Sequence, residues 1–354
     1  MTSDTTATPT GRAPAPRPPR TTGAPAHLPP GTPSPGTPAA DAPAGPAAAS
    51  GTWKLGDLEI NRMGFGAMRL PQTGEALIAD AVSRGRDQAV AVLRRAVELG
   101  VNHIDTAAFY FSPLRSANEL INRALAPYPR DLVITTKVGP GRGPSGAWLP
   151  HATPGLLRGQ VEENLRQLGL DRLDVVNLRV LGTDSIAERF GVLAELREAG
   201  LIRHLGVSNV TPGQLAEARA IAPVVCVQNP YGIGVRADQD AFVRDCAEQG
   251  IAFVPFYSIA GSARQVGVAD DDAAELPEVR AVARAHGASA ARIRLAWTLH
   301  RGPHVLAIPG TGDLGHLADN VSAAALRLST EELALLEAAH QRHGANLPDG
   351  AATA

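Results

Sequence analysis

The chain has 354 residues, a formal net charge of -2 and a hydrophobic content of 44%. The sequence shows no basic face, which argues against a nucleic-acid partner, and no apolar run approaches the roughly 20 residues that a membrane-spanning helix needs. The two cysteines, Cys226 and Cys246, form no CxxC pair, which favours a reducing cytoplasm.

The first fifty residues differ in composition from the rest of the chain. They hold 13 of the 29 prolines and no aromatic residue, so they cannot bury enough apolar surface to offset the entropy of ordering. We predict a disordered tail over residues 1–50, a single domain over 51–345 and a flexible C-terminus over 346–354. A proline-rich docking segment is the alternative interpretation of the tail.

The domain begins with a predicted β-hairpin over Trp53–Ile60, which has Gly56-Asp57 at its turn. A short β-rich run over Met63–Gly66 follows. A dinucleotide-binding Rossmann fold would place a third glycine after Gly64-Phe65-Gly66, but Ala67-Met68-Arg69 stands there instead. The sequence therefore predicts a different α/β architecture. The hairpin is predicted to close its lower end.

From there the chain alternates between helical and β-branched segments. Helices end at Gly100, Gly200 and Gly250, each followed at once by a β-rich run, as expected where glycine tolerates a positive φ. Thr153-Pro154 and Thr211-Pro212 mark two helix starts, with a capping hydroxyl before a proline. Including the early run, eight predicted strands end near these residues: Gly66, Asp105, Lys137, Arg179, Ser208, Gln228, Phe256 and Pro309. Eight such units predict a closed (β/α)8 barrel.

Active sites of such barrels lie at the C-terminal ends of the strands. Polar residues predicted there are Asp105, Tyr110, Lys137, Asn177, Arg179, Ser208, Asn209 and Gln228. Lys137 is one of only two lysines among the 33 basic residues, and its compact charge suits a crowded pocket. We predict no metal site, because Gly302-Pro303 would break any helix that aligned His300 with His304.

An acid, a phenol, an ammonium and a guanidinium together suggest proton transfer to a carbonyl. A neighbouring cation is expected to lower the pKa of Tyr110 from its usual value near 10, while Asp105 holds Lys137 by charge pairing. The result would be a general acid–base for carbonyl and alcohol chemistry. Such a redox reaction also needs a hydride carrier.

Several motifs resemble those of the aldo-keto reductases. His103-Ile104-Asp105 with Tyr110 is similar to the family's catalytic signature, and Ile134–Lys137 to its lysine strand. Gly206–Asn209, Val227–Asn229 and Ile308–Asn320 resemble the family's cofactor segments. The resemblance covers residues 52–340, and Asp174–Arg179 with Cys226–Asn229 is most similar to the bacterial pyridoxal reductases, also described as pyridoxine 4-dehydrogenases.

The resemblance implies NADPH-dependent reduction of an aldehyde or ketone, with Asp105, Tyr110, Lys137 and Arg179 as the catalytic set. Pyridoxal-like aldehydes are the implied substrates, beside Phe109 and Trp148. NADPH is the implied cofactor, with NADH as an alternative. The implied cofactor contacts are Met68, Ser208, Asn209, Gln228, Phe256, Ala260, Gly261, Ser262, Gly310, Thr311, Gly312, His316 and Asn320.

Two departures from the family pattern bear on these roles. Arg179 stands where the family usually has histidine, so a structural ion pair at the barrel mouth is the alternative to a catalytic role. Gly310 and His316 replace the usual lysine and arginine at the adenosine 2′-phosphate, which weakens the expected preference for NADPH over NADH.

Two other functions compete with the reductase hypothesis. A cofactor-binding regulatory subunit with vestigial activity would give the proline-rich tail a binding role. A glycoside hydrolase barrel would need two facing carboxylates, and only Asp105 is evident. We expect a monomer that acts on a small molecule, without nucleic-acid or membrane partners.

Overall fold

The computed structural model describes residues 45–74, 76–259 and 275–344. These residues fall in one compact unit, Pro43–Ala354. No helix among these residues combines the length and the apolar character needed to cross a bilayer.

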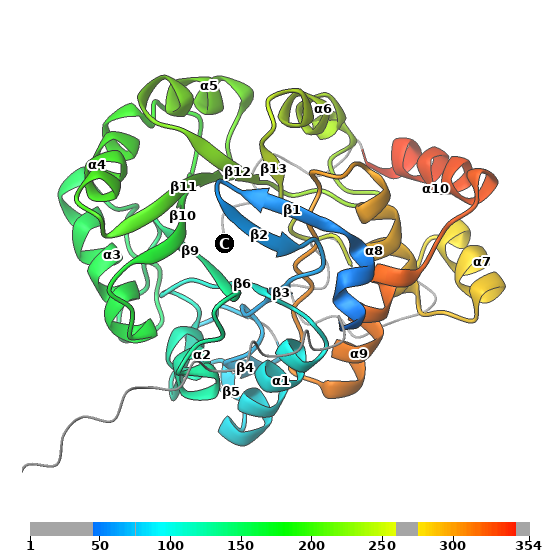
Figure 1. Ribbon diagram of the computed structural model, residues 1–354, viewed down its shortest axis with the longest axis horizontal. Helices are drawn as coiled ribbons and strands as arrows, with labels where there is room; N and C mark the ends of the chain where they lie inside the picture. The colour runs from blue at the N-terminus through cyan, green and yellow to red at the C-terminus, as the bar shows by residue number, and fades with distance from the viewer. Residues whose placement is uncertain (1–44, 75, 260–274, 345–354) are drawn as a thin grey trace, which may run out of the picture. The chain divides into compact units, whose positions relative to one another are not determined.

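A parallel barrel forms the centre of the unit (Figure 1). Its seven named strands neighbour one another in the order β13-β12-β11-β10-β9-β6-β3. In chain order they are β3 Phe65–Gly66, β6 His103–Asp105, β9 Val133–Val138, β10 Leu173–Arg179, β11 Ile202–Ser208, β12 Val224–Gln228 and β13 Ala252–Phe253. The segment around residues 305–307 closes the ring through single bridges from Val305 to Phe253 and from Ala307 to Met63. The predicted (β/α)8 barrel is confirmed.

Ten helices are described, and most of them surround the strands (Figure 1). In order they are α1 Arg86–Glu98, α2 Ala117–Leu125, α3 Pro154–Leu168, α4 Ala187–Glu198, α5 Pro212–Ile221, α6 Asp240–Glu248, α7 Pro277–His286, α8 Ala290–His300, α9 Leu314–Ser322 and α10 Thr330–His343. Two small hairpins pair β4 Gln72–Thr73 with β5 Val82–Ser83 and β7 Phe111–Ser112 with β8 Arg115–Ser116. Short 3-10 turns lie at η1 Pro46–Ser50, η2 Ala237–Gln239 and η5 Ala323–Ala325.

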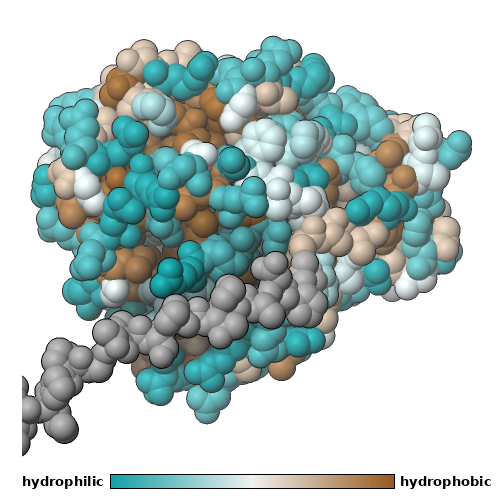
Figure 2. Space-filling view, in the orientation of Figure 1, coloured by the Kyte–Doolittle hydropathy of each residue, from teal (hydrophilic) through white to brown (hydrophobic). Residues whose placement is uncertain are grey.

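The hairpin of β1 Thr52–Leu55 and β2 Leu58–Asn61 lies across the N-terminal end of the barrel, as predicted (Figure 1). Leu55 and Ile60 are fully buried against side chains from the first halves of the strands, among them Val133 and Leu306. This face of the molecule exposes hydrophilic side chains with hydrophobic ones between them (Figure 2). The predicted functional residues Asp105, Lys137 and Arg179 lie at the other, C-terminal ends of their strands.

Local signals for helix ends are mostly realised. Gly100, Gly200 and Gly250 have φ values of 86°, 83° and 67°, which supports their predicted place after a helix. Thr211 begins α5 with a capping box completed by Gln214. The helix α3 begins at Pro154 after Thr153, as predicted, but the Thr153 hydroxyl makes no capping hydrogen bond, so that part of the prediction is wrong. A capping box needs a Glu or Gln three residues on, and α3 has Leu156 there.

The last residues of the predicted tail, before the boundary at residue 50, form the η1 turn. The η1 turn already packs on the barrel, because Ala47 is fully buried and its N–H donates to the carbonyl of Leu99 at 2.9 Å. The Ser50 hydroxyl accepts from the N–H of Met63 at 3.0 Å. Composition missed this anchor because alanine and serine carry little hydrophobic signal of their own. Most of the predicted tail, residues 1–44, and the predicted C-terminal segment lie outside the described residues.

Candidate active site

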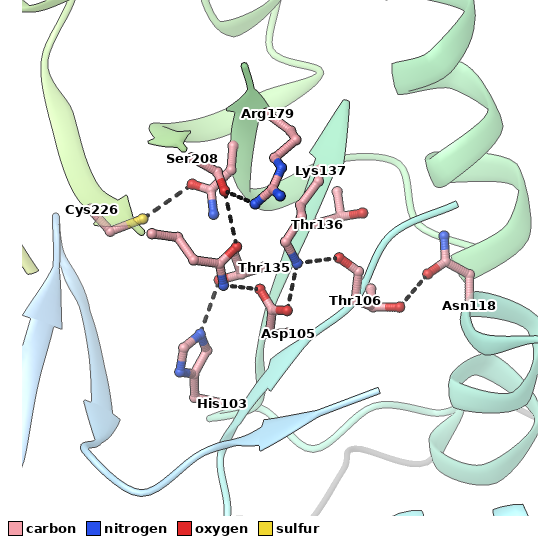
Figure 3. A network of polar contacts seen from close by, with 12 residues as sticks. His103, Asp105, Thr106, Asn118, Thr135, Thr136, Lys137, Arg179, Ser208 and Cys226 are labelled. Atoms are coloured by element: carbon pink, nitrogen blue, oxygen red, sulfur yellow. Dashed lines mark hydrogen bonds and ion pairs between the residues drawn. The ribbon is translucent and has the colours of Figure 1, made fainter. Parts of the chain in front are cut away.

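Five polar side chains predicted from the sequence gather at the C-terminal end of neighbouring strands (Figure 3). The parallel register places Arg179 beside Ser208, and Ser208 beside Gln228. Asp105 ends β6, and Lys137 lies near the end of β9. All five are buried. The alternation of side chains along each strand turns them to the interior.

Lys137 and Asp105 form a buried ion pair. The ammonium nitrogen lies 2.5 Å from Asp105 Oδ1 and 3.1 Å from the carbonyl oxygen of Thr106. Burial alone would lower the pKa of Lys137, but Asp105 and Tyr110 outweigh it and raise that pKa above its usual value. The lysine therefore stays cationic at any physiological pH.

A chain of hydrogen bonds extends from this pair around the mouth (Figure 3). The Gln228 amide donates to Asp105 Oδ2 at 2.9 Å, and Ser208 Oγ donates to the Gln228 carbonyl oxygen at 3.5 Å. Arg179 Nη1 in turn donates to Ser208 Oγ at 3.3 Å. Both oxygens of the carboxylate are thus held, and the network fixes its orientation.

Tyr110 follows β6 and lies against the ion pair. The Lys137 ammonium is 4.9 Å from the centroid of the phenol ring. Burial raises the pKa of Tyr110; the charge of Lys137 lowers it and that of Asp105 raises it further. The prediction that the pKa of this phenol is lowered is therefore wrong in sign, although Lys137 acts in the expected direction. At neutral pH the phenol keeps its proton.

Arg179 ends β10, the strand that pairs with the β9 strand of Lys137. Its guanidinium carbon is 4.7 Å from the centroid of the Phe256 ring, within the range of a cation–π contact. Burial lowers its pKa from the usual range, although the charges of Tyr110, Tyr257 and Asp105 act against that shift. Arginine remains charged even so. Phe256 thus has one neighbour on its ring that the sequence did not predict.

The side chains beneath the mouth fill the barrel. His103 Nε2 lies 3.0 Å from Thr135 Oγ1, and burial lowers the pKa of that histidine to about 4, so it is neutral. Asn177 accepts a hydrogen bond from Cys226 Sγ at 3.2 Å. A Cβ atom on Gly206 would lie 2.0 Å from Asn177 Oδ1, so this strand needs glycine there. His103 and Asn177 are thus buried in the interior of the barrel.

A second buried network behind the mouth was missed by sequence reasoning. Thr106 Oγ1 donates to Asn118 Oδ1 at 2.7 Å, and Asn118 donates to Asn164 Oδ1 at 2.9 Å. Thr136 Oγ1 donates to the same Asn164 oxygen at 2.6 Å. The hydrogen bonds tie β9 and the β6 end to α2 and α3. The one signal in the sequence that could have indicated this network was an asparagine on the buried face of each helix, Asn118 in α2 and Asn164 in α3.

Phe109 and Trp148 meet beside Tyr110. The Phe109 ring is T-shaped on Tyr110 at 5.1 Å and tilted against Trp148 at 5.9 Å. Trp148 is 39% exposed, so its ring borders solvent at the mouth. These contacts suit the predicted wall of a substrate pocket.

The residues expected to hold the cofactor follow the mouth towards α9. Asn209 has a left-handed φ of 59°, and its amide donates to the carbonyl of Val180 at 2.9 Å. Asn320 is buried, whereas His316 is exposed at the first turn of α9. Met68, Gly310, Thr311 and Gly312 lie before or after strand segments of the same mouth. Ala260, Gly261 and Ser262 lie outside the described residues.

The donors at this end fit an anionic nucleotide. The half-buried Arg84 guanidinium packs against Gly312, where a Cβ atom would lie 2.0 Å from its central carbon, and its Nη1 donates to the Gly312 carbonyl at 3.2 Å. Arg84 Nε is buried and has no hydrogen-bond partner among the described residues. The pKa of Arg69 is lowered from its usual value, mainly by burial and secondly by the charge of Arg84. Two guanidinium groups thus stand near a loop where the sequence predicted a deficit of cations.

No group of three or more His, Cys, Asp or Glu side chains is placed to hold a metal ion in the part of the chain that the structure describes. His304, considered from its spacing to His300, instead has its Nε2 3.0 Å from the carbonyl oxygen of Val243. It is a buried structural histidine.

Comparison with known proteins relates the chain to one family of enzymes. The sequence profile of the aldo/keto reductase family matches residues 62–341. Pyridoxine 4-dehydrogenase of Escherichia coli is 46% identical over 82% of this chain and 98% of its own length. The fold matches a thermostable aldo-keto reductase bound to the inhibitor epalrestat, with a TM-score of 0.67, 28% identity and coverage of 81% and 99% of the two chains. An aldo/keto reductase from Klebsiella pneumoniae in complex with NADP and acetate matches with a TM-score of 0.64, 25% identity and coverage of 80% and 92%.

Proposed function

The chain belongs to the aldo/keto reductase family, and we propose that it reduces an aldehyde or ketone to the alcohol, reversibly, with NADPH as the hydride donor. The observation that carries the proposal is the buried Lys137–Asp105 pair, 2.5 Å apart, with its ammonium next to the Tyr110 ring. A structural ion pair alone would not require a phenol beside it at the end of the barrel strands.

Tyr110 is the proton donor in this proposal. Its phenol stays protonated at neutral pH because burial raises its pKa, so it can give a proton to a carbonyl oxygen as that oxygen gains negative charge. The cations Lys137 and Arg179 then favour the phenolate that is left behind. Arg179 also offers donors for the same oxygen, in the position where the family usually has histidine.

Donors around the mouth suit the cofactor. NADPH, when bound, supplies the hydride. We assign Ser208, Asn209 and Gln228 to the nicotinamide carboxamide and Phe256 to the face of its ring. Gly310, Thr311, Gly312, His316 and Asn320 would surround the adenosine end, with Met68 at the first strand and Ala260, Gly261 and Ser262 at the pyrophosphate. The Klebsiella relative binds NADP, and Arg84 and Arg69 add positive charge for phosphates, which supports NADPH over NADH.

A pyridoxal-like aldehyde is the proposed substrate class. The support is the 46% identity to a pyridoxine 4-dehydrogenase over nearly that enzyme's whole length. Phe109 and Trp148 offer ring faces for an aromatic aldehyde, and Arg179 offers donors for its hydroxyl groups.

We propose a monomeric enzyme of the cytoplasm. Its two cysteines are free and buried, and burial raises the pKa of both thiols to about 12. Such thiols are inert and suit a reducing compartment. The alternative of a regulatory subunit rests on the tail, and nothing in the comparisons favours it.

The proposal is tested by following NADPH oxidation with a panel of aldehydes and ketones that includes pyridoxal, with NADH in parallel. We expect turnover of aromatic aldehydes, pyridoxal included, at a higher kcat/KM with NADPH than with NADH. If every carbonyl compound leaves NADPH oxidation at the background rate, the proposed function is wrong.

A further inference from the structure

Arg142 is a buried arginine in the loop between β9 and α3. The residue is only 9% exposed, and no carboxylate forms an ion pair with it among the residues that the structure describes. Burial is therefore not balanced by an opposite charge. The side chain must be held by other contacts, and their positions suggest a role at the mouth.

Among the described residues, the Arg142 guanidinium donates its hydrogen bonds to backbone carbonyl oxygens. Nη2 donates to Ile78 at 2.8 Å, and Nε donates to Gly146 at 2.9 Å. Nη1 donates to Phe111 at 2.7 Å and to Phe109 at 3.4 Å. The last two carbonyls flank Tyr110, the proposed proton donor, on both sides along the chain.

Aromatic rings complete the surroundings of Arg142. Its guanidinium carbon lies 4.4 Å from the Phe111 ring centroid and 5.8 Å from that of Trp148. Phe109 packs between Tyr110 and Trp148. We call these contacts of Arg142 with residues 78, 109–111 and 146–148 the Arg142 junction.

The Arg142 junction joins three segments that are otherwise far apart in the sequence. Only arginine carries five N–H donors in a rigid fork that can reach several acceptors at once, whereas lysine offers one compact charge. Gly146 brings the loop close enough, because its φ is 82° and a Cβ atom there would lie 2.7 Å from Ala79 Cα. The loop tip and the segment around residue 79 are therefore packed backbone to backbone.

We propose that Arg142 is a positioning residue of the reductase, which fixes the phenol of Tyr110 and the Phe109–Trp148 wall by holding these three segments together. The inference rests on the proposed function, since it gives Tyr110 the role of proton donor. Arg142 itself does not touch the reacting atoms. Its effect is on the orientation of a donor whose misplacement by about 1 Å costs on the order of 100-fold in rate.

The test compares Arg142→Ala and Arg142→Lys with Arg62→Ala. Arg62 is a matched control, because it also donates to four backbone carbonyls, those of Ser50, Leu299, Gly302 and Val305, but at the closed end of the barrel. Four quantities are measured for each protein: kcat and KM with an aldehyde that the wild type reduces, the Kd for NADPH by fluorescence, the Tm, and hydrogen exchange by peptide.

In Arg142→Ala we expect kcat to fall by roughly 10- to 100-fold, while the Kd for NADPH changes less than about twofold. Millimolar guanidinium chloride should restore kcat several-fold in this variant and not in wild type. Arg142→Lys should stay impaired. Arg62→Ala should have a lower Tm but a kcat within about twofold of the wild-type value, because the hydrogen bonds of Arg62 are remote from Tyr110. Peptides covering residues 77–80, 109–116 and 139–153 should exchange faster together in Arg142→Ala.

The inference is overturned if the Tm of Arg142→Ala falls as that of Arg62→Ala does while its kcat stays at the wild-type value. A wild type that reduces no carbonyl compound would instead remove the proposed function, and hydrogen exchange then decides about Arg142. Faster exchange of the three segments together would support the Arg142 junction, whereas faster exchange in residues 139–153 alone would contradict it. Should Arg142→Ala not fold, the same comparison is made with Arg142→Lys.

Discussion

Burial and the charge of Lys137 shift the pKa of Tyr110 in opposite directions, and burial prevails. The raised pKa keeps the phenol protonated. Lys137 remains a cation beside it, because Asp105 and Tyr110 outweigh the effect of burial and raise the pKa of the lysine. A donor that is protonated at neutral pH is ready for reduction. The reverse reaction, alcohol oxidation, needs the phenolate and must first remove that proton.

This balance predicts opposite pH dependences for the two directions. Because the group that donates is an acid with a raised pKa, reductive kcat should stay level through neutral pH and fall only above about 10, the usual value for tyrosine. Oxidative kcat should rise with pH over the same range. Initial rates in both directions between about pH 6 and 10.5 measure this. If reductive kcat already declines as the pH rises towards about 8, another group or a lowered tyrosine pKa controls the step.

The ion pair also predicts a stability effect. In Lys137→Met the Asp105 carboxylate would be left buried without its cation, and we expect the free energy of unfolding to fall by about 3–5 kcal/mol. Adding Asp105→Asn to that variant should restore part of the loss, because the stranded charge is gone. Urea unfolding of the two single variants and the double variant measures the coupling, and simple additivity would contradict a paired role.

At the scale of elements, local signals account for much of the fold. The helix-ending glycines and the β-branched runs predicted the alternation of strands and helices, and the predicted C-terminal ends of the strands placed Asp105, Lys137 and Arg179 at one mouth. Lys137 was identified by its rarity and by its place on a predicted strand. What these signals cannot supply is the distance between side chains from different strands, such as the hydrogen bond from Gln228 to Asp105.

Two helix starts with the same first three residues show how far a local signal extends. Thr153 and Thr211 each precede Pro-Gly, but only Thr211 has a glutamine at the third helical position, and only its hydroxyl caps. We expect Thr211→Ala to cost about 1 kcal/mol and Thr153→Ala to cost close to nothing. Urea unfolding of the two variants tests this, and equal losses would contradict the account.

Other site features have no local signal. Arg142 and Arg84 lie in loops, and their contacts come from segments tens or hundreds of residues away. Asn118 and Asn164 sit in helices where asparagine is a poor helix former, and this conflict with local propensity was the one available hint of a buried network. Pairings of this kind depend on the tertiary fold and cannot be read from neighbouring residues.

At the scale of the whole molecule, the two ends of the barrel have different tasks. The closed end is filled by the β1–β2 hairpin and by apolar side chains, while the open end holds Asp105, Lys137 and Arg179 (Figure 3). Substitutions at the closed end should therefore change stability, and those at the open end should change turnover. This division is the reason that Arg62 serves as a control for Arg142.

The contacts of the η1 turn with the barrel give a prediction at this scale. A chain that begins at Pro43 retains the η1 turn, whereas a chain that begins at Gly51 loses the hydrogen bonds of Ala47 and Ser50 to the barrel. Three hydrogen bonds at about 1 kcal/mol each predict a Tm lower by roughly 5–10 °C in the shorter chain. Calorimetry of the two chains measures it. Equal Tm values would mean that the η1 turn does not anchor the barrel.

The central claim, proton donation by Tyr110, is tested most directly by Tyr110→Phe with Tyr128→Phe as the control. Tyr128 donates its hydroxyl proton to the carbonyl of Leu168 at 2.6 Å, at the end of α3. The measurement is kcat for aldehyde reduction together with the Kd for NADPH. We predict that kcat falls by roughly 10²- to 10⁴-fold in Tyr110→Phe while NADPH binds as before, and that Tyr128→Phe keeps its kcat. Turnover near the wild-type rate in Tyr110→Phe would contradict the account.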